Sequence, residues 1–217
     1  LLLFKTSDFE SVETHQKRTR LLNLNAAEET AFSQELKKYL EAGEEKKIHE
    51  RYKCKQRKRW FDVPIIRTGE ACFFKRFHKL PKLIVNEAAI HTTDVSYNIR
   101  FNEKINPASF AFCFYNSLTM ALCEYNGRFY GGGVGELVPS EFKEICVPYH
   151  EISEEKISYL DDLFRENAPY TEIIDYVDSH VLAELPNDVI SLLQQIRNRY
   201  LTRRMKLYRR EDGTLGE

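Results

Sequence analysis

The chain has 217 residues, of which 42% are hydrophobic and 30% are charged, and its formal net charge is −1. The apolar content is sufficient for a packed core, which excludes a chain that is disordered throughout. The neutral total excludes binding to a polyanion by overall charge alone. The charges are nevertheless unevenly distributed, because Lys and Arg are concentrated in 44–60 and 197–210, and acidic residues in 150–190.

The cysteine and histidine content indicates a reduced protein without a metal site. The five cysteines form no Cys-x-x-Cys pair, and the six histidines are scattered. We therefore expect a cytoplasmic protein in which cysteines are small core residues. The uncharged segment 105–123 is long enough to cross a bilayer, but its Asn, Pro, Ser and Thr residues favour a buried helix. No signal-peptide pattern follows Leu1, and we expect the chain to be a piece of a longer one.

The first half of the chain is predicted to contain one helix and several short strands. Residues 20–24 favour a strand. Asn25 and Glu28 form a capping-box pattern, and apolar residues then recur at helical spacing as far as Gly43, which predicts a helix over 26–43. Stretches rich in aromatic and β-branched residues, separated by turn signals, predict strands over 52–63, 71–77, 83–86 and 95–101.

The second half is predicted to be largely helical. Asn106 as a cap and Pro107 at the first helical position predict a helix that runs to about residue 125 and ends at Gly127. A strand is expected near 145–147, followed by helices over 153–166, 170–184 and 187–209. This order predicts an α+β fold with a β-rich central domain, flanking helices and a C-terminal helical segment. We expect a mixed α/β domain over 1–150 and a helical subdomain over 151–217.

The segment 52–61 concentrates cationic residues beside aromatic ones. As a strand, it would direct alternate cations to one face: Lys53, Lys55, Arg57 and Arg59. One interpretation is an exposed sheet edge whose charges prevent aggregation. The other is a strand that follows a nucleic-acid backbone, with Trp60 or Phe61 packing or stacking beside it.

Two further stretches also have two interpretations each. Gly131–Gly133 is either a simple turn between a helix and a strand, or a place where backbone approaches a phosphate or base edge together with Arg128 and Tyr130. It is not a P-loop, because no Gly-Lys-Ser or Gly-Lys-Thr follows. The His-Thr-Thr-Asp sequence at 91–94 is either a turn held by local side-chain hydrogen bonds or a set of polar groups that contact DNA.

Motifs of self-contained enzymes are missing from the sequence. It has no Gly-x-Ser-x-Gly, no paired histidines on one helix turn, and no Asn-Pro-Pro-Tyr or Asp-Pro-Pro-Tyr loop. A glycine-rich loop of the kind that binds a methyl donor is also missing. We therefore expect no catalytic residue in this chain.

Several blocks of the sequence occur in the order found in one known family. They are the basic stretch 52–64 with Trp60, Pro81-Lys-Leu-Ile-Val-Asn86, His91-Thr-Thr-Asp94, Phe114-Tyr-Asn116-Ser117, Gly127-Arg128-x-Tyr130-Gly-Gly-Gly133, Glu136-Leu-x-Pro-Ser-Glu141 leading to Val147-Pro148, and a final basic helix with Arg203-Arg204. In this order they resemble the carboxy-terminal target-recognition region of type II-like adenine-N6 DNA methyltransferases from bacterial restriction-modification systems. The resemblance covers roughly residues 50–210.

The resemblance implies a division of labour between this chain and an upstream domain. S-adenosylmethionine and the Asn-Pro-Pro-Tyr loop would belong to the upstream catalytic domain, and no cofactor to this chain. The 1–150 domain would bind double-stranded DNA and read the target sequence while the catalytic domain flips the target base out of the duplex. No membrane partner is implied.

The resemblance also implies roles for particular residues. Phosphate contacts fall to Lys53, Lys55, Arg57, Lys58 and Arg59, with Trp60 beside them. Polar or base contacts fall to Asn86, Thr92, Thr93, Asp94, Asn116, Arg128 and Tyr130, and close backbone approach to Gly131, Gly132 and Gly133. The role of Arg203 and Arg204 stays open, because basic residues at a helix end also favour the helix dipole or pair with the acidic segment 150–190.

Two alternatives from other classes remain. The acidic helices over 150–190 would suit a protein-interaction module that docks a basic partner or a second copy of the chain. An RNA-binding or nuclease-associated domain would also use the basic and aromatic residues near Trp60, and it would bind single strands better than duplex.

Overall fold

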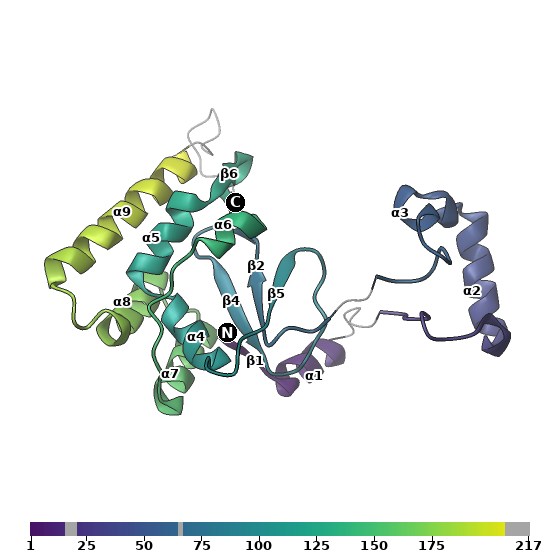
Figure 1. Cartoon of the computed structure of the whole chain (residues 1–217), viewed down its shortest axis with the longest axis horizontal. Coiled ribbons are helices and arrows are strands. Elements are labelled where there is room, and N and C mark those ends of the chain that lie inside the picture. The colour runs from purple at the N-terminus through teal and green to yellow at the C-terminus, as the bar shows by residue number, and fades with distance from the viewer. Residues whose placement is uncertain (16–20, 65–66, 207–217) are drawn as a thin grey trace. The chain divides into compact units, whose positions relative to one another are not determined.

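The computed structural model describes residues 1–15, 21–64 and 67–206, which form two compact units (Figure 1). The larger unit comprises Leu1–Glu10 and the described residues from Arg67 onward, and the smaller unit comprises the described residues of Ser11–Ile66. The fold is α+β, as predicted. The expected boundary at residue 150 does not separate the two units, because the helices that follow it pack on the same core as the central sheet.

Two small sheets form the β structure of the larger unit. The first has the strand order β1 (Leu3–Phe4), β4 (Lys82–Asn86), β2 (Ala71–Phe74), β5 (Ser96–Ile99). β1 runs parallel to β4, and the other pairs are antiparallel, with Ala71 opposite both Val85 and Ile99. The second has the order β3 (Arg76–Phe77), β7 (Val134–Glu136), β6 (Arg128–Tyr130), all antiparallel. The strand predicted over 71–77 is therefore divided at Lys75 between two sheets.

The helix predicted over 107–125 is interrupted. α4 (Pro107–Phe114) ends before Tyr115, and α5 (Ser117–Asn126) begins after Asn116. Asn116 acts as a second N-cap, because its side chain accepts a hydrogen bond from the Thr119 amide at 2.9 Å. Both helices carry apolar residues into the core of the larger unit, where Phe112, Phe114 and Tyr115 are at most 1% exposed.

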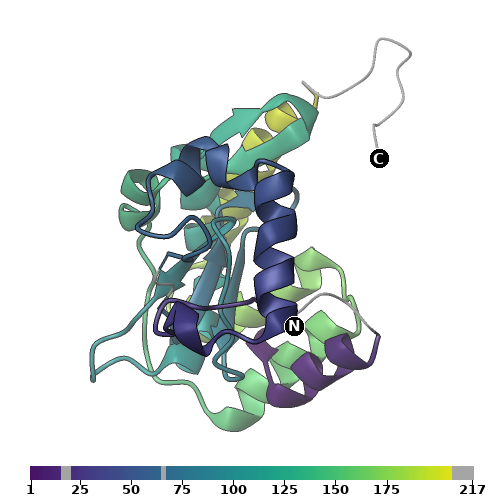
Figure 2. The ribbon, with the colours of Figure 1, turned by 90° about the vertical axis from the view of Figure 1, so that its right-hand side faces the viewer.

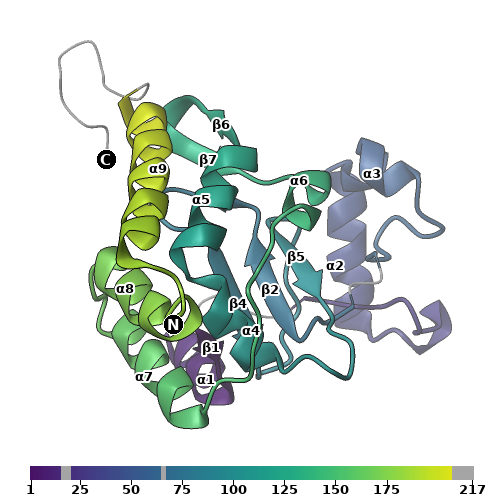
Figure 3. The ribbon, with the colours of Figure 1, turned by 60° about the vertical axis from the view of Figure 1, so that its left-hand side comes forward.

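The C-terminal helices agree with the sequence prediction within a few residues. They are α7 (Glu154–Arg165), α8 (Tyr170–Val181) and α9 (Asn187–Lys206). A further short helix, α6 (Pro139–Lys143), precedes them and was not predicted. The strand predicted near 145–147 does not form, and that stretch is irregular. α9 lies along α5 (Figure 3), and Tyr200 of α9 meets Tyr125 of α5 edge to face at 5.8 Å between ring centroids. Among the described residues, no helix has the length and apolar character needed to cross a membrane.

Two buried aspartates of the acidic segment support the fold. Asp161 is 2% exposed and accepts hydrogen bonds from the main-chain amides of Leu2 and Leu3, at 2.6 and 3.0 Å. Asp178 is 3% exposed and accepts a hydrogen bond from the Ser117 amide at 2.7 Å, at the start of α5. Two acidic residues of 150–190 therefore stabilise the larger unit by accepting buried main-chain hydrogen bonds, one at the start of the chain and one at the start of α5.

The amino-terminal segment is also held by an ion pair that should make the larger unit sensitive to acid. The Arg165 guanidinium lies 2.7 Å from the Asp8 carboxylate and holds the pKa of that carboxyl at about 2, below its ordinary 3.8. A carboxyl with a lowered pKa in the folded state stabilises the fold above its unfolded pKa, and this contribution is lost as the pH falls through the folded value. The contribution at pH 5 is on the order of 2 kcal/mol, before screening of the partly exposed Arg165.

We therefore expect Asp8→Asn to lower the unfolding free energy at pH 5 and to match the wild type near pH 2. Urea denaturation at pH 5, 4, 3 and 2 measures the difference between the two proteins. Asp94→Asn is the control, since Asp94 is exposed and makes no hydrogen bond or ion pair with a described residue. A difference between wild type and Asp8→Asn that is constant over this range would contradict the assigned role of the ion pair.

The smaller unit is built around α2 (Gln34–Glu45), its longest helix (Figure 2). Two short 3-10 turns, η1 (Glu29–Ala31) and η2 (Ile48–Glu50), precede and follow it, and α3 (Tyr52–Lys55) comes next. The predicted start at residue 26 is wrong, because Ser33 caps the helix by accepting a hydrogen bond from the Leu36 amide. Asn25 instead bonds both main-chain groups of Val63, at 2.7 and 2.9 Å. The strand predicted over 20–24 is not formed at residues 21–24, and residue 20 lies outside the described residues.

A small core holds the smaller unit together. Leu24, Phe32 and Leu40 are buried there, and Trp60 and Phe61 pack against them. The predicted helix end at Gly43 is also wrong, because α2 continues to Glu45 and Gly43 is buried against the Trp60 ring.

Gly43→Ala should therefore destabilise the smaller unit by about 1–3 kcal/mol, despite the better helix propensity of alanine. A Cβ at residue 43 would lie 2.5 Å from Cη2 of Trp60. Trp60 is the only tryptophan of the chain, so its fluorescence during urea denaturation reports on this unit. In a Trp60→Phe background, followed by circular dichroism, the same glycine substitution should be neutral or stabilising. An equal loss in both backgrounds would show that the ring contact is not the cause.

Candidate nucleic-acid interface

The basic segment of the smaller unit is not a strand. Tyr52–Lys55 is one turn of helix, and turns follow it, with the Arg57 amide bonded to the Cys54 carbonyl and the Asp62 amide to the Arg59 carbonyl. The expected row of alternating cations on one strand face is therefore wrong. The local reason is that the main-chain amides of Cys54, Lys55, Arg57 and Asp62 bond to carbonyls three or four residues earlier, which is the pattern of a helical turn and not of strand pairing.

Arg59 binds the smaller unit itself. Its guanidinium lies 2.8 Å from the Asp62 carboxylate and donates to the main-chain carbonyls of Leu24 and Ala27, both at 2.7 Å. It also lies over the Phe61 ring, 5.0 Å from the centroid. The hydrogen bond to Asp62 raises the pKa of Arg59 and lowers that of Asp62. Arg59 therefore fastens 24–27 to 59–62, and we do not include it in the proposed interface.

Trp60 and Arg57 are also partly engaged in the smaller unit. The Trp60 indole donates to Glu44 at 3.0 Å and packs on Gly43, and Arg57 donates weakly to the Trp60 carbonyl at 3.4 Å. Both side chains are half-buried. The ring of Trp60 therefore fills the core of this unit, and its indole N–H is directed to Glu44.

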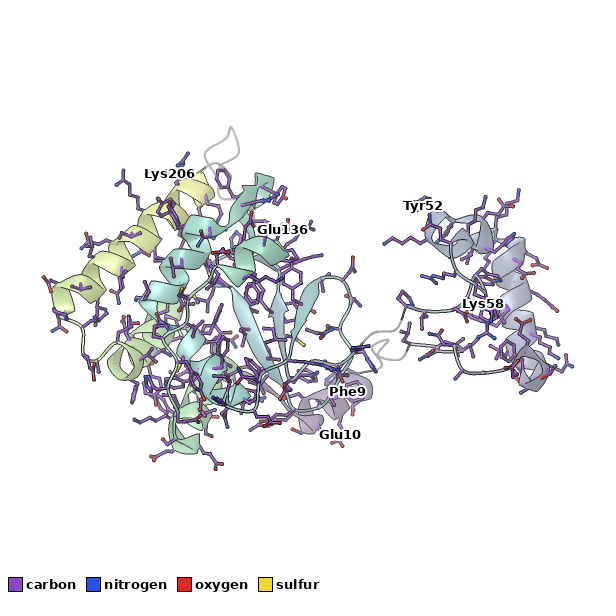
Figure 4. The ribbon with its side chains drawn as sticks, in the orientation of Figure 1. Phe9, Glu10, Tyr52, Lys58, Glu136 and Lys206 are labelled. Atoms are coloured by element: carbon purple, nitrogen blue, oxygen red, sulfur yellow. The ribbon has the colours of Figure 1, made fainter. Side chains whose placement is uncertain are left out.

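Three cations of the segment are open to solvent. Lys53, Lys55 and Lys58 are exposed, and their side chains make no hydrogen bond or ion pair with any residue that the structure describes. Figure 4 marks Lys58 together with Tyr52, whose side chain is 77% exposed. We call these three the free lysines. They have the availability that phosphate contacts require.

The two asparagines predicted to contact DNA are turned into the larger unit. Asn86 is 7% exposed, and its amide group donates to the carbonyls of Gly69 and Ile90, at 3.0 and 2.9 Å. Asn116 is 0% exposed and donates to the Cys113 carbonyl at 2.6 Å. Their hydrogen-bonding groups are used within the fold, so we leave them out of the interface.

The loop at 91–94 behaves as a turn in which three of the four residues, His91, Thr93 and Asp94, are exposed. The Thr92 hydroxyl donates to Asn98 at 3.1 Å, which agrees with the interpretation as a locally bonded turn. The side chains of Thr93 and Asp94 are exposed. Thr93 thus stays available for a contact, whereas the negative charge of Asp94 does not favour phosphate.

The glycine cluster connects two strands rather than a helix and a strand. β6 and β7 pair in an antiparallel hairpin, and Gly131–Gly133 forms the loop between them. Gly132 and Gly133 have φ of 86° and 66°, in the left-handed region that glycine tolerates, whereas Gly131 has open space at its Cβ position. The hairpin presents exposed side chains from β6, with Phe129 and Tyr130 49% and 51% exposed.

Arg128 is exposed but already has an acidic partner. Its guanidinium lies 2.5 Å from the Glu141 carboxylate of α6, and this hydrogen bond raises the pKa of Arg128. Its side chain is 56% exposed, so the pair is accessible to water and exchangeable with a phosphate.

A hollow lies between the β6–β7 hairpin and α9. Its lining includes Tyr125, Arg128, Phe129, Tyr200 and Arg203, which come from α5, β6 and α9. The sequence did not single out the three aromatic residues, and no spacing in it places α9 beside the hairpin. Among the described residues there is no group of three His, Cys, Asp or Glu side chains that would hold a metal ion.

Comparison with known families defines the class of protein. Residues 1–182 match the family model described as Type II methyltransferase M.Eco57I, C-terminal domain. Since the match covers most of the chain, the protein belongs to this family of type II methyltransferase C-terminal domains. No curated protein and no solved structure matches the chain. The resemblance to the C-terminal region of a restriction-modification methyltransferase is thus confirmed.

Proposed function

We propose that this chain is the DNA-binding, sequence-specificity portion of a bacterial adenine-N6 DNA methyltransferase of a restriction-modification system. It acts in the cytoplasm and holds duplex DNA for base flipping by an upstream catalytic domain. The DNA-binding role is supported by the free lysines, Lys53, Lys55 and Lys58, because they occur in a chain that belongs to this methyltransferase family. The exposed hairpin residues Arg128 and Tyr130 of the larger unit provide additional contacts.

Electrostatics favours phosphate as the partner of the free lysines. Each lysine that neutralises a DNA phosphate releases condensed counterions, and this release favours binding. The gain in binding free energy becomes smaller as the salt concentration rises. An intramolecular salt bridge would compete with this contact, and the free lysines have none among the described residues. They therefore bind phosphate without first breaking an ion pair, unlike Arg128.

The methyl transfer itself is assigned to the upstream domain. The sequence contains no Asn-Pro-Pro-Tyr loop, so no residue here is proposed to bind the target adenine or S-adenosylmethionine. Extrusion of a base costs a few kcal/mol in stacking and pairing. Binding energy from the recognition portion offsets that cost and keeps the duplex in register.

The experiment measures duplex binding by the 217-residue chain as a function of salt, using fluorescence anisotropy with a labelled random-sequence duplex. The variant Lys53→Ala/Lys55→Ala should bind more weakly, and the slope of log K against log salt should fall by about two. Lys37→Ala/Lys38→Ala removes the same charge from α2 of the same unit and serves as the matched control.

An unchanged salt slope in the Lys53/Lys55 variant would contradict the proposal, as would an equal fall in the control. Tighter binding to single-stranded RNA than to duplex DNA would favour the RNA-binding alternative. Two results together would favour the protein-interaction alternative. The wild type would fail to bind duplex, and charge reversal on α7 and α8 would abolish self-association.

A further inference from the structure

α9 has a buried face whose arginines fix its rotation. Arg204 is 4% exposed and binds Glu124 of α5 through two hydrogen bonds, at 2.6 and 3.1 Å. Arg197 is 3% exposed, donates to the Lys79 carbonyl at 2.8 Å and lies over the Tyr170 ring. Leu201, which lies between them in sequence, is also buried. These three residues define the face of α9 that packs against the rest of the larger unit.

The opposite face carries polar and cationic side chains at helical spacing. Six exposed residues recur at intervals of three or four from position 195 to the last turn (Figure 4 labels the final one): Gln195, Asn198, Arg199, Thr202, Arg203 and Lys206. We call them the outer face of α9. None of their side chains makes a hydrogen bond or ion pair with another residue in the described part of the chain.

Three other arginines of the larger unit do have acidic partners. Arg76, Arg128 and Arg165 each lie within 3.4 Å of a carboxylate. On the outer face, Arg199 and Arg203 lie beside amide and hydroxyl side chains, and neither has an acidic partner among the residues that the structure describes. The surface is therefore positive, and it is lined with groups that both donate and accept hydrogen bonds.

We propose that the outer face of α9 reads base edges in the major groove of the target DNA, an inference that rests on the proposed function. Arg and Lys pair with guanine, Asn and Gln pair with adenine, and Thr bonds either kind of base or contacts thymine methyl groups. A single α-helix fits the width of the major groove. From residue 195 to 206 the helix rises about 16 Å, which is the length of roughly five base pairs.

Other contacts support DNA over an acidic protein as the occupant. Arg203 also lines the hollow that contains Arg128 and Phe129, so the outer face continues into the hairpin surface. The exposed apolar residues of α9 are in its amino-terminal half, at Val189, Leu192 and Ile196, whereas its cations all lie in its carboxy-terminal half, from Arg197 to Lys206. The family match ends at residue 182, before α9, so membership of the family assigns no role to this helix.

Base reading is tested by selection from a duplex library with a randomised core, sequenced after binding to the 217-residue chain. The wild type should enrich one sequence pattern. Gln195→Ala/Asn198→Ala should lose the preference at one or more positions by roughly tenfold to a hundredfold, and should retain its affinity for random duplex within about twofold. Ser158→Ala/Thr171→Ala, which changes two exposed polar residues on α7 and α8, is the matched control.

The outcomes separate this inference from the proposed function. No duplex binding by the wild type would overturn both. Binding without any enriched pattern, an unchanged pattern in Gln195→Ala/Asn198→Ala, or the same loss in the control would overturn base reading by α9 alone, as would a uniform loss of affinity for all sequences. Unfolding curves that match the wild type show that each variant is folded.

Discussion

Replacement of Arg204 with methionine is expected to lower the unfolding free energy by about 3–5 kcal/mol, because it leaves the Glu124 carboxylate charged and unpaired in the interior. The two side chains are 4% and 3% exposed and lie 2.6 Å apart. Arg204 also donates to the main-chain carbonyls of His78 and Gly133, and its guanidinium lies over the Phe77 ring. Urea denaturation followed by circular dichroism measures the loss.

Arg203→Met is the matched control, since it changes the neighbouring arginine on the exposed side of the same turn. It should alter stability by no more than about 0.5 kcal/mol. The double variant Arg204→Met/Glu124→Leu removes both charges and should be less destabilised than the sum of the single changes. Additive effects, or a loss in Arg204→Met no larger than that in Arg203→Met, would refute the role assigned to the buried pair.

The second large effect is expected for Asn116→Ala, at about 2–4 kcal/mol. The substitution removes the N-cap of α5, which accepts from the Thr119 amide, and it leaves the buried Cys113 carbonyl without the donor that lies 2.6 Å away. The same urea titration measures it.

Asn106→Ala provides the comparison for Asn116, because Asn106 caps α4 through the Ser109 amide and is itself exposed. It should cost about 1 kcal/mol. If the two alanine variants lose the same amount, burial of Asn116 contributes nothing beyond the cap. A loss of duplex binding by a fully folded Asn116→Ala protein would restore this residue as a DNA contact.

The helices after residue 150 could be predicted from sequence because their signals are local. Pro169 and Pro186 separate the helical patterns, and the observed bounds differ from the predicted ones by a few residues. The break between α4 and α5 was missed, although Asn116-Ser117 is a cap signal, because it lies inside an apolar run. The break is stabilised by a residue that is distant in sequence, because the Asp178 carboxylate of α8 accepts a hydrogen bond from the Ser117 amide.

The basic segment shows why alternation alone misled. Its cations alternate as a strand would require, but Arg59 bonds to carbonyls at Leu24 and Ala27, more than thirty positions away. No pattern within ten residues reports that contact. Of the five cations, the sequence could not tell which are free and which support the fold.

The orientation of α9 could not be predicted either. The apolar face of this helix in the sequence consists of Val189, Leu192, Leu193 and Ile196, and all of these except Leu193 are more than a third exposed. Two arginines take interior positions instead, and Arg204 bonds to Glu124 while Arg197 donates to the Lys79 carbonyl. Hydrophobic periodicity carries no information about such buried cations, and so it missed the outer face.

The pairing of β1 with β4 sets the limits within which the larger unit can be dissected. That unit is assembled from chain on both sides of the smaller one, so a fragment that starts at Arg67 lacks Leu2 and Leu3. Such a truncation would expose the main chain of β4 as an open sheet edge, which promotes aggregation. Transfer of the larger unit to another protein therefore requires that its first ten residues be included.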